Sequence, residues 1–341
     1  MVEPRLLAHL AELGATDEQL AGLDNDDLIG LAGDLQLRAG LDLDLDDVAR
    51  AAGCDVEQIR AVYEGMGLRV EDLAGFGVGD VALMSLITQD VSGIVDIVGP
   101  QLLRVAGSSL TRLAEATVAA YVQDVEHRDD ALRDLLSEAD QNALASTLVL
   151  VLGDALPTVF RHHMWTAVRR QRMAQSGVAS PEIVRLAIGF VDLVGFTTIS
   201  RFAGPAELIA TIDEFERQAF EIAHRLGGRI VKSIGDEVMI AGHDARTVAA
   251  IALDLIGAVD ADPSVAPRGG VSAGDVLFRL GDYYGSVVNL ASRLTAEAVP
   301  GEVLTDQPLA GGDEFAVQPA GRRSLKGFDE PVAVWSVEPA R

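Results

Sequence analysis

The chain has 341 residues, of which 49% are hydrophobic and 23% are charged, so it is long enough for two domains with buried cores. Its formal net charge of −25 argues against a non-specific grip on nucleic acid and disfavours anionic membrane surfaces. One cysteine, Cys54, excludes an internal disulfide and fits a reducing compartment. We find no signal-peptide pattern and no apolar stretch near the ~20 residues of a membrane span, so we expect a cytoplasmic protein.

Residues 1–160 are predicted to be helical throughout. Apolar residues recur at three- and four-residue spacing in LLAHLAEL, DDLIGLAGDLQL and SSLTRLAEATVAAYVQDV, and Gly and Asp residues stand between such segments as caps. The pattern contains no strand, nucleophile–base pair, metal cluster or phosphate loop. We therefore expect an all-α regulatory or dimerisation domain. Residues 81–98 and 143–160 are apolar enough to be buried on all sides, where they could form a dimer core or line a pocket for an apolar ligand.

Residues 161–182 are predicted to connect two domains. The segment Arg161–Gln175 is a dense basic run that contains His162 and His163, and SGVASP after it is typical of a linker. A basic helix is usually a solvated surface. Because histidine titrates near neutral pH, the two histidines are also candidates for a regulatory switch.

From residue 183 the hydrophobic period changes, and we expect a second domain over residues 183–341. The predicted order is strand 184–193, helix 206–226, a hairpin of strands 229–234 and 237–240, helix 245–259, strand 268–278, loop 279–284, helix 285–298, strand 302–305 and a short β region to 337. This is a βαββαβ, ferredoxin-like core of the α+β class, with the helices expected on one face of an antiparallel sheet.

Two carboxylates stand at strand ends in this core. Asp192 follows an apolar run in AIGFVDLVGFTTIS, and Asp236 occupies the hairpin tip in VKSIGDEVM. Each alone is as readily a turn or cap residue. If the two strands are neighbours, the carboxylates meet at one edge of the sheet, where two divalent cations (Mg²⁺ or Mn²⁺) fit between them and the Leu193 carbonyl supplies a further oxygen.

Groups suited to a nucleotide surround this pair in the sequence. The free N–H groups of the turn after Asp192 would suit a triphosphate, and Lys326 is a further cation for it; the turn comprises Val194, Gly195, Phe196 and Thr197. In GDYYGSVVNLASR, Asn289 and Arg293 are four apart and share one helix face, where they would suit a ribose oxygen and the charge on a five-coordinate phosphorus.

Lys232 and Asp282 offer one donor and one acceptor. Adenine presents an N6 donor and an N1 acceptor, so this pair could read adenine, whereas guanine presents the reverse pattern.

The four segments FVDLVGFTTIS, VKSIGDEVM, DYYGSVVNLASR and SLKGFDEPVAVW, taken together, resemble the class III nucleotidyl cyclase catalytic domain over about residues 183–337. The resemblance implies conversion of ATP to cyclic AMP and pyrophosphate. It implies that Asp192 and Asp236 are metal ligands and that Lys232 and Asp282 select adenine. It also implies that Asn289 and Arg293 act in the transition state and that Lys326 binds the triphosphate.

The resemblance also implies a homodimer, because in this family the site forms between two catalytic domains. One chain here carries a complete residue set, so two equivalent shared sites are expected. The helical first half resembles the N-terminal autoregulatory domain of certain soluble actinobacterial-type cyclases.

Two alternatives stay open at this point. The chain could be a guanylate cyclase, or a non-catalytic sensor with a cyclase fold. A third reading comes from residues 311–315, which spell GGDEF, the signature of diguanylate cyclases. In that family a helix and further strands follow the motif, whereas only 341 − 315 = 26 residues follow here, so we interpret it as a chance loop.

Overall fold

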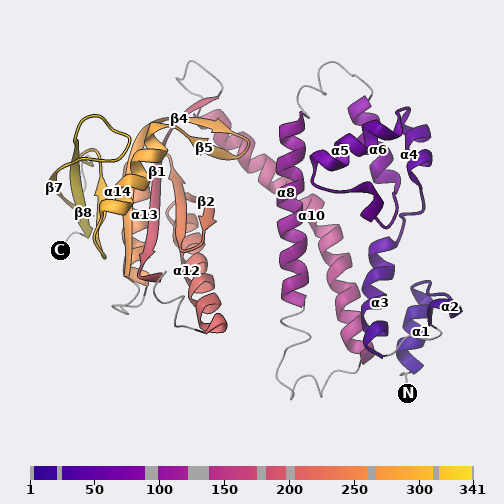
Figure 1. Cartoon of the computed structure of the whole chain (residues 1–341). Coiled ribbons are helices and arrows are strands. Elements are labelled where there is room, and N and C mark those ends of the chain that lie inside the picture. The colour runs from indigo at the N-terminus through magenta and orange to yellow at the C-terminus, as the bar shows by residue number, and fades with distance from the viewer. Residues whose placement is uncertain are drawn as a thin grey trace. The chain divides into compact units, whose positions relative to one another are not determined.

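The computed structural model describes residues 4–20, 25–88, 99–121, 138–174, 182–196, 204–259, 266–309 and 315–339. The chain divides into two compact units, Met1–Trp165 and Thr166–Arg341 (Figure 1). The boundary lies inside one helix, α10 (Glu138–Ala174), within the predicted connector. Among the described helices, none is both long and apolar enough to cross a membrane.

The described residues of the first unit are helical, as expected. The elements are α1 (Pro4–Glu12), α2 (Asp17–Leu20), α3 (Asn25–Arg38), α4 (Leu45–Ala52), α5 (Val56–Gly65), the 3₁₀ turn η1 (Val70–Asp72), α6 (Val78–Thr88), α8 (Pro100–Tyr121) and α10 (Glu138–Ala174). Val48, Ile59 and Met84 are fully buried where α4, α5 and α6 pack together. Asp44 and Asp55 close capping boxes at the starts of α4 and α5, which satisfies backbone N–H groups there.

The apolar segment 143–160 lies on α10, where the side chains of Val151 and Phe160 are 57% and 65% exposed in the single chain. Its burial in a dimer core or around an apolar ligand stays a prediction. Hydrophobicity alone does not specify which surface covers a helix. The other apolar segment, 81–98, is described only to residue 88, where α6 ends, and its remainder lies outside the described residues.

The second unit is built on an eight-stranded sheet, counted over its described residues. The strands are β1 (Ile183–Val194), β2 (Arg229–Ile234), β3 (Glu237–Gly242), β4 (Ala266–Arg279), β5 (Asp282–Tyr284), β6 (Val303–Thr305), β7 (Phe315–Arg323) and β8 (Val332–Pro339). Their order is β2-β3-β1-β4-β6-β8-β7, with β5 paired to β4. Every pair is antiparallel except β4–β6. The α+β class is confirmed.

The helices α12 (Pro205–Arg225), α13 (Ala245–Ala258) and α14 (Ser286–Glu297) cover both faces of this sheet. Along β1, Ala187 and Val191 pack in one cluster with α12 and α13, and the alternate residues Ile188 and Phe190 pack in another with α14. Because alternate residues of a strand point to opposite faces, α14 lies on the face opposite α12 and α13. The prediction that all helices share one face is wrong.

A short strand also lies inside the predicted loop 279–284. Leu280 and Gly281 adopt φ values of 54° and 84°, and this tight turn folds β5 back along β4, so that Phe278 pairs with Tyr283. The chain thus reverses direction between β4 and α14, and α14 crosses the other face of the sheet.

Candidate active site

The two predicted metal carboxylates lie at the same end of the sheet. β1 and β3 are antiparallel neighbours in which Asp192 pairs with Glu237, and the Leu193 N–H donates to the Asp236 carbonyl at 3.2 Å. Asp236 occupies the turn between β2 and β3, where Gly235 adopts a φ of 65°. The strand order therefore brings the two acids together.

The oxygen atoms at this edge fit a hard divalent cation. In an extended strand the N–H and C=O of one residue point to the same side, so the Leu193 carbonyl faces the hairpin together with its N–H. Partial burial raises the pKa of Asp236, and the nearby charge of Asp192 raises it further. A bound cation would oppose both effects.

The two carboxylates are too few to fill the coordination sphere of a divalent cation. Within the part of the chain that the structure describes, no cluster of three or more His, Cys, Asp or Glu side chains is arranged to hold a metal. A cation at Asp192 and Asp236 would therefore keep positions open for phosphate oxygens, as magnesium sites in nucleotide enzymes do.

Two further residues at this edge were not predicted from the sequence. Glu237, Asp192 and Arg268 form a row across β3, β1 and β4. Arg268 donates from Nε and Nη2 to Asp192 Oδ2 at 3.2 and 3.1 Å, and from Nη1 to the carbonyls of Ala296 and Ala298 at 2.8 and 3.2 Å. The arginine thus joins Asp192, a predicted metal ligand, to the end of α14.

Burial raises the pKa of Glu237 to about 7, and the charges of Asp192 and Asp236 add to this effect while Arg268 opposes it. The only sequence signals for these residues were an acid next to Asp236 and an arginine in a predicted strand.

The predicted base-reading residues meet directly. Lys232 Nζ lies 2.5 Å from Asp282 Oδ2, although 50 residues separate them in the sequence. A β-bulge between Ile230 and Lys232 shifts the register so that Lys232 pairs with Met239, which packs on the α14 side of the sheet. Asp282 begins β5, so the reversal after β4 brings it to the same face.

The predicted transition-state pair and the triphosphate lysine line one pocket of about 300 Å³. Asn289 and Arg293 project into it from α14, and Lys326 reaches it from the loop before β8, together with Ser286, Gly327 and Phe328. The opposite side of α14 is buried against the sheet through Val287, Ala291, Leu294 and Thr295.

The remaining predicted residues have varied positions. Val194 ends β1, Gly195 adopts a φ of 90°, the Phe196 side chain is buried in the core, and Thr197 lies outside the described residues. His162 and His163 are exposed on α10 in the first unit. Of the GGDEF segment, residues 311–314 are also outside the description, and Phe315 begins β7.

The carboxylate edge, the base-reading pair and the transition-state pocket are three groups of side chains in the second unit. No hydrogen bond or ion pair joins the three groups in the described residues.

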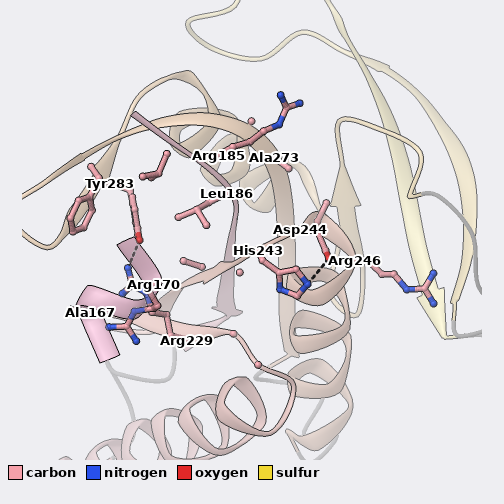
Figure 2. Close-up of a pocket in the computed structure, with 18 of the residues that line it drawn as sticks. Ala167, Arg170, Arg185, Leu186, Arg229, His243, Asp244, Arg246, Ala273 and Tyr283 are labelled. Atoms are coloured by element: carbon pink, nitrogen blue, oxygen red, sulfur yellow. Dashed lines mark hydrogen bonds and ion pairs between the residues drawn. The ribbon is translucent and has the colours of Figure 1, made fainter. Parts of the chain in front are cut away.

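A larger cavity of about 1310 Å³ lies elsewhere in the second unit, where the last turns of α10 meet the sheet (Figure 2). On one side Arg229 Nη2 donates to the Tyr283 hydroxyl at 2.5 Å, and burial together with the charge of Arg229 lowers the pKa of Arg170. On another side His243 and Asp244 form an ion pair of 2.7 Å. None of the predicted site residues lines this cavity, so cavity size does not identify the reaction centre.

Comparison with known proteins agrees with this geometry. The family described as "Adenylate and Guanylate cyclase catalytic domain" matches residues 178–338. An uncharacterised protein of Mycobacterium tuberculosis is 34% identical over 97% of this chain and 89% of its own length. An adenylate cyclase of Streptomyces coelicolor is 32% identical over 77% of this chain and 69% of its own length. A pH-sensitive adenylate cyclase of Mycobacterium tuberculosis is 28% identical over 98% of this chain and 87% of its own length.

The sheet topology, the paired acids at the ends of β1 and β3 and these matches lead to one assignment. The chain belongs to the class III nucleotidyl cyclase family, whose catalytic domain is its second unit.

Proposed function

We propose that this chain is an adenylate cyclase, which converts ATP into 3′,5′-cyclic AMP and pyrophosphate. The observation that carries the choice of adenine is the pairing of Lys232 with Asp282 at 2.5 Å. The Asp282 carboxylate accepts from the N6 amino group of adenine, and the Lys232 ammonium donates to N1. Guanine would bring its O6 acceptor to the acid and its N1 donor to the lysine. Two relatives that are named adenylate cyclases support the same choice.

We also propose that the site is shared between two copies of the chain. Catalytic domains of this family bind nucleotides and often dimerise. In this arrangement one copy supplies Asp192 and Asp236, and the other copy supplies the base-reading and transition-state groups. A two-fold homodimer then has two equivalent centres.

The reaction is an in-line displacement at the α-phosphorus. The ribose 3′ oxygen loses its proton and bonds to phosphorus, while the bond to the β-phosphate oxygen breaks and pyrophosphate leaves. Asn289 orients the ribose, Arg293 stabilises the negative charge on the α-phosphate, and Lys326, in the same pocket, binds the departing phosphates.

Cyclases of this family generally use divalent cations. Two such cations would activate the 3′-hydroxyl and neutralise pyrophosphate when bound at Asp192, Asp236 and the Leu193 carbonyl. Arg268 holds Oδ2 of Asp192 and so fixes the orientation of this carboxylate.

Reversal of the base-reading pair tests the substrate. The double variant Lys232→Glu/Asp282→Ser presents acceptors to guanine N1 and N2 and a donor to O6. We expect kcat/KM for ATP to fall at least about 100-fold, since two charge-assisted hydrogen bonds are lost at about 1.5–3 kcal/mol each. Initial rates with ATP and GTP, in the presence of Mn²⁺, measure this.

Each alternative has a distinct result in that assay. A wild-type preference for GTP, with little effect of the double variant on ATP, would establish a guanylate cyclase. No cyclic nucleotide from either substrate would establish a non-catalytic sensor.

We further propose that the first unit regulates the second, with His162 and His163 as the candidates for a pH response. A relative named as pH-sensitive aligns over 98% of this chain. The ratio of the activity at about pH 6 to that at about pH 8 is the quantity to compare, because histidine titrates in this range. This ratio should differ at least about twofold between the full chain and a chain beginning at Gln175. Superimposable pH–activity curves would remove the pH proposal.

A further inference from the structure

We infer that Thr295 is a positioning residue whose hydroxyl seats α14 on the sheet and thereby sets where Asn289 and Arg293 meet the substrate. The inference rests on the proposed function, because it assigns α14 to the transition state. It concerns a residue that contacts neither nucleotide nor cation and that acts through the helix that carries it.

The Thr295 side chain is 1% exposed, and its hydroxyl lies between two backbone carbonyls. Oγ1 is 3.2 Å from the carbonyl oxygen of Phe190 on β1 and 3.0 Å from that of Ala291, one turn earlier in α14. The contact with Ala291 is the usual back-bond of a helical threonine. The contact with Phe190 is a bond between α14 and β1, two residues before Asp192.

The backbone of α14 lies directly on β4 at the same level. Gly270 pairs with Phe190, and a Cβ atom at Gly270 would lie 2.3 Å from the Thr295 nitrogen and 2.5 Å from the Ala291 carbonyl oxygen. No side chain separates helix and strand there. The hydroxyl of Thr295 and the glycine therefore fix one contact point for the helix.

Arg293 is two residues before Thr295, about 200° around the helix, and it points away from the sheet. It lines the 300 Å³ pocket together with Asn289 and Lys326. Since a helix of this length moves as a rigid body, a change at the buried contact is passed to the reacting side. The end of α14 has its own attachment, where Arg268 binds the carbonyls of Ala296 and Ala298.

A second buried threonine provides a matched control. Among the described residues, Thr305 at the end of β6 is 0% exposed, and its hydroxyl oxygen has no hydrogen-bond partner there. Valine has nearly the shape of threonine but lacks the hydroxyl. Thr295→Val and Thr305→Val thus make the same chemical change at two buried sites, of which only the first bonds α14 to β1.

We expect Thr295→Val to lower kcat at least about tenfold, because displacements of 1 Å can cost about 100-fold in rate. KM for ATP and the half-saturating Mn²⁺ concentration should stay within about twofold of wild type, since Arg293 acts mainly in the transition state. Thr295→Ser should restore kcat to within about twofold, and Thr305→Val should leave kcat unchanged. The inference would be overturned if Thr295→Val had the same kcat as Thr305→Val. It would also be overturned if Thr295→Ser lost as much kcat as Thr295→Val.

Mixed dimers locate the effect. In a mixture of Asp192→Ala and Arg293→Ala chains, the active centre takes Arg293 from the first chain and Asp192 from the second. When Thr295→Val is added to the Asp192→Ala chain, which supplies Arg293, the activity of the mixture should fall about tenfold. When it is added to the Arg293→Ala chain instead, the activity should change little. Equal losses in both placements would refute a positioning role. An inactive mixture without Thr295→Val would instead refute the shared centre, and the homodimer comparison would still decide the role of Thr295.

Discussion

Asp192→Ala and Asp236→Ala are each expected to lower cyclic AMP formation at least about 10³-fold, equivalent to about 4 kcal/mol of activation free energy. Each variant removes one of the two carboxylates that fit a cation at the end of β1 and the start of β3. Among the described residues, no group of three or more His, Cys, Asp or Glu side chains could hold the cation in their place. Cyclic AMP production at saturating Mn²⁺ and Mg²⁺ measures the loss.

The fold should survive both changes. The pKa of Asp236 is raised by burial and by Asp192, so its charge is disfavoured in the folded state, and Asp236→Ala should melt no lower than wild type. Asp192→Ala loses an ion pair with Arg268 between partly exposed side chains, worth about 1 kcal/mol or less. Asp275→Ala, an exposed acid near the other end of β4, should keep full activity. Activity of either alanine variant within tenfold of wild type would contradict the assignment of the metal ligands.

A mixture of two inactive variants is expected to recover about a quarter of wild-type activity. When Asp192→Ala and Arg293→Ala chains associate at random, about half the dimers are mixed, and each mixed dimer has one intact centre out of two. Rates are measured after co-refolding or co-expression, with the fraction of mixed dimers determined from two affinity tags.

The control mixture combines Asp192→Ala with Asp236→Ala. Both changes fall on the same half of the shared centre, so no arrangement of the two chains unites both carboxylates, and no recovery is expected. Recovery in this control, or its absence in the first mixture despite abundant mixed dimers, would contradict the shared-centre proposal.

The local pattern of the sequence was enough to predict the ends of β1 and β3. An apolar run that ends in Asp192 and a Gly-Asp turn at 235–236 each define a strand terminus, and the two strands prove to be neighbours. The types of the side chains indicated Lys232 and Asp282 as residues that could read adenine together. Their contact with each other was not predicted, because it depends on the β-bulge before Lys232 and on the turn into β5.

What the sequence did not predict depends on register and on reversals of the chain. Arg268 and Glu237 flank Asp192 only because β4 and β3 pair with β1 at one particular offset, which no local pattern encodes. The strand β5 lies within the segment that was predicted to be a loop, and the face that α14 covers was not predicted either. Thr295 resembles any helical threonine until the Phe190 carbonyl is seen beside it.

The ion pair between Lys232 and Asp282 has a consequence for selectivity. Without a nucleotide, the two side chains form an ion pair with each other. An entering purine must replace this contact with contacts of its own, so the binding free energy reflects only the difference between the two sets of contacts. In the proposed function, adenine would replace both halves of the broken pair, whereas guanine would set donor against donor and acceptor against acceptor. Discrimination would then not require tight binding, because both purines part the two groups but only adenine restores the contacts that they lose.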